Sequence, residues 1–175
     1  MITNKQQKIL FSVDDIQDKV NELGQQISKD YEGKKLVVIS LLRGSFIFAA
    51  DLVRAIELPT QIEFMTTASY GHGEESSGQV SIISDIKDDI EGRDVLVVDD
   101  IMDSGLTMEK ILNHLKMKNP NSIKSCVMLD KPERRKTEIT PDYVGFAIPD
   151  LFIVGYGLNY GDYYRNIPYI FSFVD

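Results

Sequence analysis

Residues 94–107, DVLVVDDIMDSGLT, decide the fold class of this chain. The stretch begins with a short valine-rich run, which is typical of a strand buried on both faces of a parallel sheet. It continues through two aspartates into a Ser-Gly-x-Thr turn. Beyond the turn, Met108, Ile111, Leu112 and Leu115 lie at helical spacing. A strand that passes directly into a helix in this way predicts a βα unit.

A second unit of the same kind lies earlier in the chain. The apolar run KLVVISLL, residues 35–42, is followed by Arg43-Gly44-Ser45 and by a helical face from Phe48 to Ile56. Periodicity and turn residues predict a further helix over 12–30, strands over 61–69, 80–85, 122–129, 142–148 and 151–157, a mobile loop over 69–79, and an irregular aromatic segment over 159–175. Strands that alternate with helices predict an open, mainly parallel α/β sheet flanked by helices.

Composition and charge exclude several classes. Nineteen lysines and arginines stand against 27 aspartates and glutamates in 175 residues, a net charge of −8, which argues against nucleic acid as a partner. Cys126 is the single cysteine and there are two histidines, so a disulfide framework and a zinc cluster are excluded. No apolar run approaches the roughly 20 residues that span a bilayer, and no signal peptide is recognisable. We therefore expect one cytoplasmic domain over residues 1–175, without membrane contact.

The strand ends carry the candidate chemistry, because ligands of open α/β sheets bind beyond the carboxyl ends of the strands. Asp99, Asp100 and Asp103 end or follow the strand in the 94–107 stretch, and residues 104–107 open the next helix. Unpaired amides, a glycine and two hydroxyls at a helix start form a phosphate-binding turn. The nearby carboxylates suit ribose hydroxyls or a hydrated Mg²⁺. The chain has neither a P-loop nor a GxGxxG turn, and the acidic pair lies too late in the chain for a response-regulator receiver.

The run VLVVDDIMDSGLTM carries a family resemblance, and four separated segments extend it, namely LLRGSFIFAADLVRAI, SYG…SSG, the stretch around Lys131, and VGFAIPDLFIVGYGLNYGDYYRNIP. Together they resemble type I phosphoribosyltransferases, in particular the bacterial hypoxanthine(-guanine) enzymes, over roughly residues 35–168. The resemblance implies the type I fold, with a small hood formed by the N-terminal helix and residues 150–175. It also implies an Mg²⁺-dependent transfer of hypoxanthine or guanine to phosphoribosyl pyrophosphate, giving IMP or GMP and pyrophosphate, in a homodimer or homotetramer.

The resemblance assigns roles to the residues of the acidic stretch. Asp99 and Asp100 face the ribose hydroxyls and the metal. Asp103 is the general base or acid at purine N7, a task that suits a carboxylate held beside the base. The 5′-phosphate is wrapped by Ser104, Gly105, Leu106 and Thr107.

The remaining assignments rest on the same resemblance. Arg43, Gly44 and Arg165 bind pyrophosphate, and the family often has a cis peptide before the residue at position 43. Lys131 donates to the 6-oxo group, which disfavours adenine. Phe152 stacks on the base, with Ile153 and Asn159 beside it. The loop that begins at Ser69 and Tyr70 is a lid that excludes water from the reacting centre.

Two alternatives stay open. The family usually has aspartate where this chain has Asn159, so binding of a second Mg²⁺ or the choice of purine can differ. The second hypothesis is a regulator that keeps the phosphoribosyl pyrophosphate fold for sensing and binds RNA or another protein, although the acidic balance opposes RNA binding. Within the enzyme class, the sequence does not rank guanine, hypoxanthine and xanthine.

Overall fold

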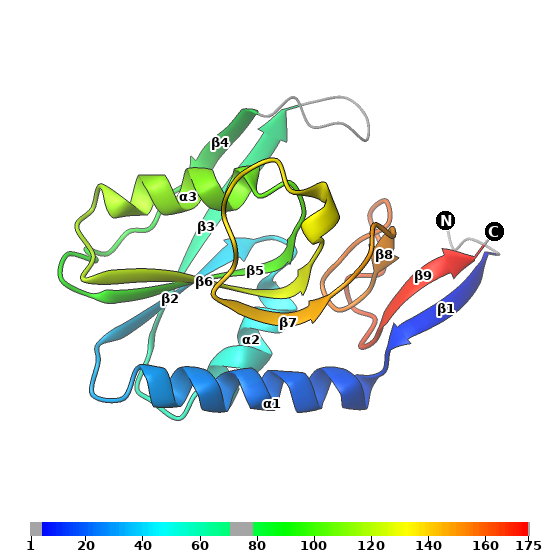
Figure 1. Ribbon diagram of the computed structural model, residues 1–175, viewed down its shortest axis with the longest axis horizontal. Coiled ribbons are helices and arrows are strands. Elements are labelled where there is room, and N and C mark those ends of the chain that lie inside the picture. Colours follow the sequence, from blue (N-terminus) through cyan, green and yellow to red (C-terminus); the bar gives the residue numbers. More distant parts are fainter. Residues whose placement is uncertain (1–4, 71–78, 175) are drawn as a thin grey trace.

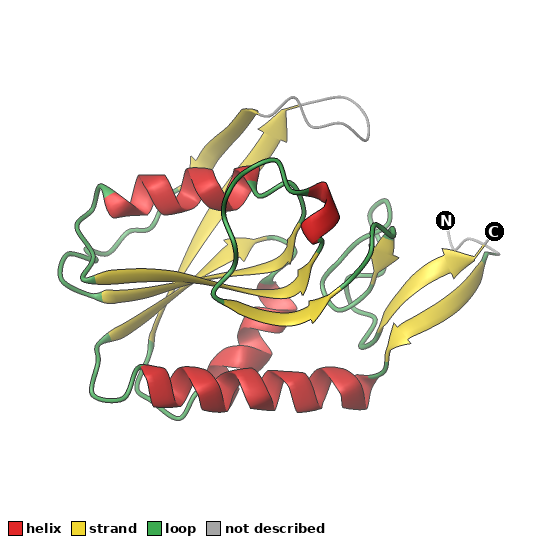
Figure 2. Ribbon diagram, in the orientation of Figure 1, coloured by secondary structure: helices red, strands yellow, loops and turns green. Residues whose placement is uncertain are grey.

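The computed structural model describes residues 5–70 and 79–174 and contains a six-stranded sheet between layers of helices (Figure 1, Figure 2). The strand order is β4-β3-β2-β5-β6-β7. All neighbours are parallel except β3 and β4, which form an antiparallel pair. The strands are β2 (Leu36–Leu42), β3 (Gln61–Tyr70), β4 (Gln79–Ser84), β5 (Asp94–Met102), β6 (Ser122–Asp130) and β7 (Tyr143–Ala147). This is the mainly parallel α/β sheet that the sequence predicts.

Three helices cover the two faces of the sheet. Helices α1 (Val13–Asp30) and α2 (Phe46–Ala55) lie on one side, and α3 (Leu106–Lys116) lies on the other (Figure 1). Helix α1 begins at the predicted place because Ser12 forms a capping box. Its Oγ accepts from the Asp15 amide at 3.1 Å, and the Asp15 carboxylate accepts from the Ser12 amide at 2.9 Å.

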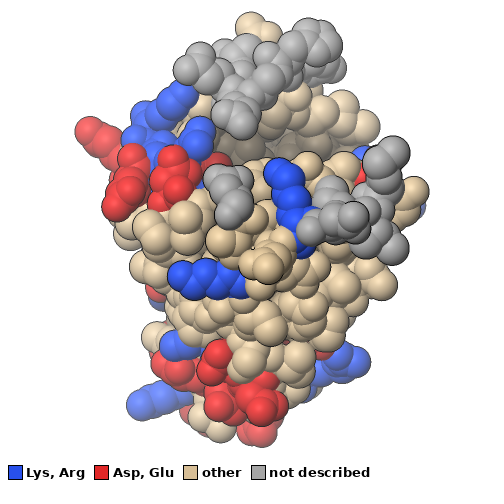
Figure 3. All heavy atoms as spheres, turned by 90° about the vertical axis from the view of Figure 1, so that its right-hand side faces the viewer, with Lys and Arg blue, Asp and Glu red and all other residues tan. Residues whose placement is uncertain are grey.

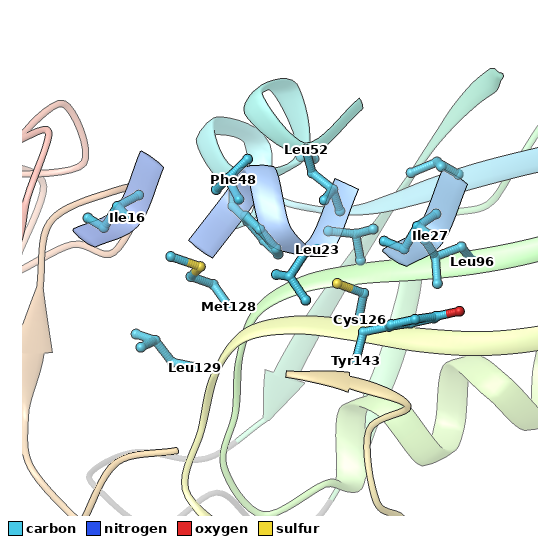
Figure 4. Close-up of a cluster of buried hydrophobic side chains, with 14 of the residues drawn as sticks. Ile16, Leu23, Ile27, Phe48, Leu52, Leu96, Cys126, Met128, Leu129 and Tyr143 are labelled. Carbon is cyan, nitrogen blue, oxygen red and sulfur yellow. The ribbon is translucent and has the colours of Figure 1, made fainter. Parts of the chain in front are cut away.

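The apolar strands contribute side chains to two cores, one on each face. Leu96, Cys126 and Met128 pack under Leu23 of α1 and Phe48 of α2 (Figure 4). Their neighbours along the strands point to the opposite face and pack against α3. Burial on both faces is the reason why β2, β5 and β6 are continuous apolar runs.

A second, three-stranded antiparallel sheet joins the two ends of the chain. Its order is β1 (Gln6–Phe11), β9 (Ile170–Val174), β8 (Ile153–Val154), and β1 and β9 lie beside each other at the far end of the molecule (Figure 1). The sequence did not predict β1, and the expectation that 159–175 is irregular is wrong for β9.

The strand predicted over 151–157 is also too long. Gly155, Tyr156 and Gly157 have φ values of 98°, 50° and 100°, which turn the chain away from an extended path. Only Ile153 and Val154 remain in β8. Within the part of the chain that the structure describes, no helix is long and apolar enough to cross a membrane.

Candidate active site

The carboxyl ends of β2, β5 and β6 meet at one edge of the sheet, and the residues singled out in the sequence follow these strands. Strand β5 ends in the acidic pair, β2 leads into Arg43 and Gly44, and β6 leads into Lys131. In the parallel pairing of β5 with β6, Met102 lies opposite Asp130. Parallel pairing therefore brings three loops, distant in sequence, to one edge of the sheet, where ligands of such sheets bind.

The acidic pair is half-buried near the end of β5. The Asp100 amide donates to Asp99 Oδ1 at 2.9 Å, and the Ile101 amide donates to Asp100 Oδ1 at 2.8 Å. Burial and the adjacent carboxylate raise the pKa of Asp99 well above its usual range. Burial also raises the pKa of Asp100, although the positive charge of Arg165 acts in the opposite direction. The site is therefore short of positive charge.

This deficit fits a divalent cation. No group of three or more histidine, cysteine, aspartate or glutamate side chains within residues 5–70 and 79–174 could hold a metal ion by itself. Mg²⁺ does not need such a cage, because proteins usually bind it through one or two carboxylates together with substrate phosphates. Asp99 and Asp100 match that donor set, and a cation would offset their repulsion.

The turn after β5 forms a small cradle at the start of α3. Gly105 is the N-cap residue with φ 85°, and the Leu106 amide donates to Ser104 Oγ at 3.3 Å. A cavity of about 80 Å³ is lined by Asp99, Asp103, Ser104, Gly105 and Thr107, among others. The positive end of the helix dipole and unpaired amides point into such a cradle, which suits a phosphate.

The loop after β2 lies against the acidic pair. The peptide bond Leu42–Arg43 is cis, as the resemblance suggested. A Cβ added at Gly44 would lie 1.9 Å from Asp100 Oδ2, so a glycine is required for this close approach. On its other side, a Cβ at Gly157 would lie 2.2 Å from the Gly44 carbonyl oxygen. Arg165 donates to the Gly157 carbonyl oxygen at 2.7 Å, which holds its guanidinium near Asp100.

The residues that the resemblance assigns to the purine base follow β6 and β7. Lys131 is only 6% exposed, and its Nζ lies 3.6 Å from Asp150 Oδ1. Phe152 is 62% exposed and contacts Tyr160 edge to face at 5.9 Å between ring centroids. An aromatic ring of this size left in solvent has a free face for stacking.

Two further predicted residues lie near that ring. Ile153 is buried in β8, and Asn159 is exposed with its amide donating to the Gly161 carbonyl oxygen at 2.7 Å. Of the predicted lid, 69–79, Ser69 and Tyr70 end β3 and Gln79 begins β4. Residues 71–78 lie outside the described part of the chain.

The segment after β6 contains residues that the sequence analysis missed. Arg135 pairs with Asp130, and its Nε donates to the Asp103 carbonyl oxygen at 3.3 Å. The Lys136 amide donates to the Ser104 carbonyl oxygen at 2.8 Å. These contacts brace the phosphate turn from the side of Lys131. The only signal for them was the basic run KPERRK at a strand end.

Arg134 was missed as well. Its Nε lies 3.1 Å from Asp103 Oδ1, and its NH1 lies 3.4 Å from both carboxylate oxygens of Asp150. Because Asp150 also faces Lys131, four charged side chains of alternating sign line this wall of the cleft.

The fold and the strand-end residues define an α/β protein whose candidate site combines paired carboxylates, a glycine turn at a helix start and an exposed aromatic ring. Comparison with known proteins shows its family. The model of the phosphoribosyl transferase domain matches residues 10–161. The chain is 49% identical over 175 residues to the hypoxanthine-guanine phosphoribosyltransferase of Aquifex aeolicus, covering 99% of this chain and 98% of that protein. It is 50% identical over 165 residues to the hypoxanthine phosphoribosyltransferase of Buchnera aphidicola, covering 93% of each.

Solved structures give the same result. The hypoxanthine-guanine phosphoribosyltransferase of Bacillus anthracis, crystallised with a HEPES molecule in its active site, has a TM-score of 0.92 at 48% identity and covers 98% of this chain and 100% of its own. The chain therefore belongs to the phosphoribosyltransferase family, on the branch of the hypoxanthine(-guanine) phosphoribosyltransferases of purine salvage. The family resemblance and the type I fold expected from the sequence are both confirmed.

Proposed function

We propose that this chain transfers the phosphoribosyl group of phosphoribosyl pyrophosphate to hypoxanthine or guanine, giving IMP or GMP and pyrophosphate. The observation that carries the proposal is the meeting of three loops at one sheet edge. One is a phosphate turn with paired carboxylates, one is a glycine loop after β2, and one carries the buried Lys131. Because these three loops lie close together, one site can hold both substrates, and the transfer between them becomes effectively unimolecular.

The sugar side of the cleft is assigned to β5 and the turn after it. Amides and hydroxyls of Ser104, Gly105, Leu106 and Thr107 hold the 5′-phosphate at the start of α3. Asp99 and Asp100 accept hydrogen bonds from the ribose hydroxyls and hold Mg²⁺. When bound, this ion neutralises charge on the pyrophosphate leaving group.

The leaving group is assigned to the loop after β2 and to the C-terminal segment. Arg43, the backbone of Gly44 and Arg165 bind pyrophosphate. Gly44 allows the loop to lie against Asp100, so that pyrophosphate and ribose are held side by side. The lid over 69–79 closes over the reacting centre and excludes water, which would otherwise hydrolyse the ribosyl group.

The base side is assigned to the hood and the loop after β6. Phe152 stacks on the purine, Ile153 and Asn159 lie at its edge, and Lys131 donates to the 6-oxo group. Asp103 exchanges the proton of N7 as N9 attacks the sugar. Adenine has an amino group where Lys131 needs an acceptor, so the site discriminates against it. The buried position of Lys131, with Asp150 at 3.6 Å, supports this assignment.

The wider proposal keeps the expectations drawn from the sequence. The whole chain acts as one domain with a small hood, in the cytoplasm, as a homodimer or homotetramer. Neither nucleic acid nor membrane is a partner. On the face of the molecule near β1 and β9, lysines and arginines lie among acidic and uncharged side chains (Figure 3). Asn159 brings no negative charge, which leaves second-metal affinity and the ranking of guanine, hypoxanthine and xanthine as properties to be measured.

The test is to incubate the purified protein with Mg²⁺, phosphoribosyl pyrophosphate and each of hypoxanthine, guanine, xanthine and adenine in turn. Nucleotide formed from the 6-oxopurines but not from adenine supports the proposal. No nucleotide from any base, together with measurable binding of phosphoribosyl pyrophosphate, would refute it and favour a regulator.

A variant tests the assignment of the proton-transfer residue in the same assay. Asp103→Asn is expected to lower turnover about 100-fold, within the range for a general acid or base, while nucleotide binding changes little. Equal turnover in this variant would remove Asp103 from its role.

A further inference from the structure

We propose that Arg134 is a positioning residue that holds the Asp103 carboxylate at a fixed spacing from Lys131. The inference rests on the proposed function, in which Asp103 serves purine N7 and Lys131 serves the 6-oxo group. These two acceptors lie side by side on one edge of a 6-oxopurine. A donor and a proton acceptor that read this edge must therefore be held at a constant separation.

The contacts of Asp103 show how Arg134 orients it. Asp103 Oδ1 is completely covered and accepts no well-aligned hydrogen bond, and its close neighbour is Arg134 Nε at 3.1 Å. The Asp103 side chain as a whole is nevertheless 46% exposed. With Oδ1 covered and close to Arg134, Oδ2 is the carboxylate oxygen left to serve N7. A carboxylate held on one side has a single oxygen available for N7.

The other contacts of Arg134 tie it to Lys131. The Arg134 amide donates to the Lys131 carbonyl oxygen at 3.2 Å in the short 3₁₀ turn η1 (Pro132–Arg134). At the far end of its side chain, NH1 lies 3.4 Å from both oxygens of Asp150, which in turn lies 3.6 Å from Lys131 Nζ. The sequence of charges is therefore Asp103, Arg134, Asp150, Lys131, alternately negative and positive. Arg134 is joined to Lys131 at both ends.

Lys131 gains a defined orientation from the same arrangement. Its ammonium group is buried and faces one oxygen of Asp150, which leaves N–H donors for an exocyclic oxygen. Since Asp150 is shared between Lys131 and Arg134, movement of either cation changes the position of the other. Recognition of the 6-oxo group and proton exchange at N7 are thereby coupled through one carboxylate.

A double-mutant cycle measures this coupling. Arg134→Gln removes the charge and keeps most of the side chain, and we expect it to lower kcat for hypoxanthine about 10-fold or more, with KM for phosphoribosyl pyrophosphate changed less than about twofold. Combined with Asp103→Asn, the same change is expected to have no additional effect on kcat, because a residue that acts through Asp103 has nothing left to position. Arg134→Lys is expected to recover part of the activity.

Controls separate positioning from simple stability. Arg54→Gln removes another exposed arginine that is paired with an aspartate, Asp51, on α2, and its kcat is expected to match the unchanged protein. Thermal unfolding of each variant checks the fold. If Arg134→Gln does not fold, Asp150→Asn replaces it in the cycle, because it removes the other anchor of the Arg134 guanidinium.

Three results would overturn the proposal. The first is an Arg134→Gln variant with unchanged or higher kcat, and the second is an equal loss of kcat with and without Asp103. The third is an increase in KM for phosphoribosyl pyrophosphate with no change in kcat. If the unchanged protein forms no nucleotide, the proposed function and the role of Arg134 are both refuted. If the unchanged protein is active but the effects of Arg134→Gln and Asp103→Asn on kcat are additive, only the role of Arg134 is refuted.

Discussion

Gly44→Ala is expected to destroy the site while leaving the fold nearly intact. The structure gives the size of the disturbance, because the added Cβ would lie 1.9 Å from Asp100 Oδ2 and 2.8 Å from Asp100 Cγ. Ordinary contact begins near 3.4 Å, so the carboxylate oxygen must move by about 1.5 Å, the difference between the two distances. The clash falls on the end of a side chain, which can rotate away, rather than on backbone.

The two consequences of this movement differ in magnitude. Overpacking of this kind lowers the free energy of unfolding by about 1–3 kcal/mol. A misplacement of about 1 Å in a catalytic arrangement can cost about 100-fold in rate, so we expect kcat/KM for phosphoribosyl pyrophosphate to fall about 100-fold or more. The Mg²⁺ concentration that gives half-maximal activity is expected to rise, since Asp100 is one of its two proposed ligands.

Gly92→Ala is the matched control for the assay. Gly92 lies in the turn before β5 with φ 67°, and no atom lies within 4 Å of an added Cβ. Alanine at this position is strained by roughly 1–2 kcal/mol but lies at the opposite edge of the sheet from the cleft. Steady-state kinetics and urea unfolding should therefore show a loss of activity in Gly44→Ala and a loss of stability alone in Gly92→Ala. Wild-type kcat/KM in Gly44→Ala would refute the reasoning.

Three further predictions concern single side chains. Lys131→Ala is expected to reduce the preference for hypoxanthine over adenine about 10-fold or more, measured as the ratio of kcat/KM values, and an unchanged ratio would contradict its assignment. Burial raises the pKa of the Cys126 thiol, so this thiol should not react with a thiol reagent at pH 8 unless guanidinium unfolds the protein. Burial of Asp85 raises its pKa, but hydrogen bonds from the His114 side chain and the Ile86 amide outweigh burial and lower it. Because a lowered carboxyl pKa stabilises the fold above the unfolded value near 3.9, Asp85→Asn is expected to reduce the free energy of unfolding by about 0.5–1 kcal/mol at pH 7. This difference should shrink as the pH falls below the unfolded value and the carboxyl group of the folded protein is protonated.

Local patterns in the sequence determined most of the central fold. The continuous apolar runs of β2, β5 and β6 reflect burial on both faces, and a run of this kind is visible without any long-range information. Ser12 and Asp15 marked the start of α1 because the capping box spans only four residues. The phosphate turn was equally visible, since its amides, glycine and hydroxyls are consecutive in the chain.

The terminal strands were decided by tertiary structure. Strand β1, QQKILF, is exposed along most of its length, and it forms a strand because Gln7 lies opposite Phe173 at the other end of the chain. A pairing over such a sequence separation leaves no periodic signal in either segment. The left-handed run from Gly155 to Gly157 likewise fits its tertiary packing, since a Cβ at Gly155 would meet the Tyr169 carbonyl oxygen and one at Gly157 would meet that of Gly44.

The charged wall of the cleft also needed the folded chain. Asp103, Arg134 and Asp150 lie in three different segments that follow β5, β6 and β7, and Arg134 and Asp150 each read alone as a solvated surface charge. Parallel pairing of β5, β6 and β7 places those connections at one edge, where 3–4 Å contacts give the charges their partners. Sequence by itself therefore determined the elements of the central sheet and the candidate phosphate turn, because both are local. Tertiary structure alone decided which distant side chains share the base side of the cleft, because that depends on how the strands are ordered in the sheet.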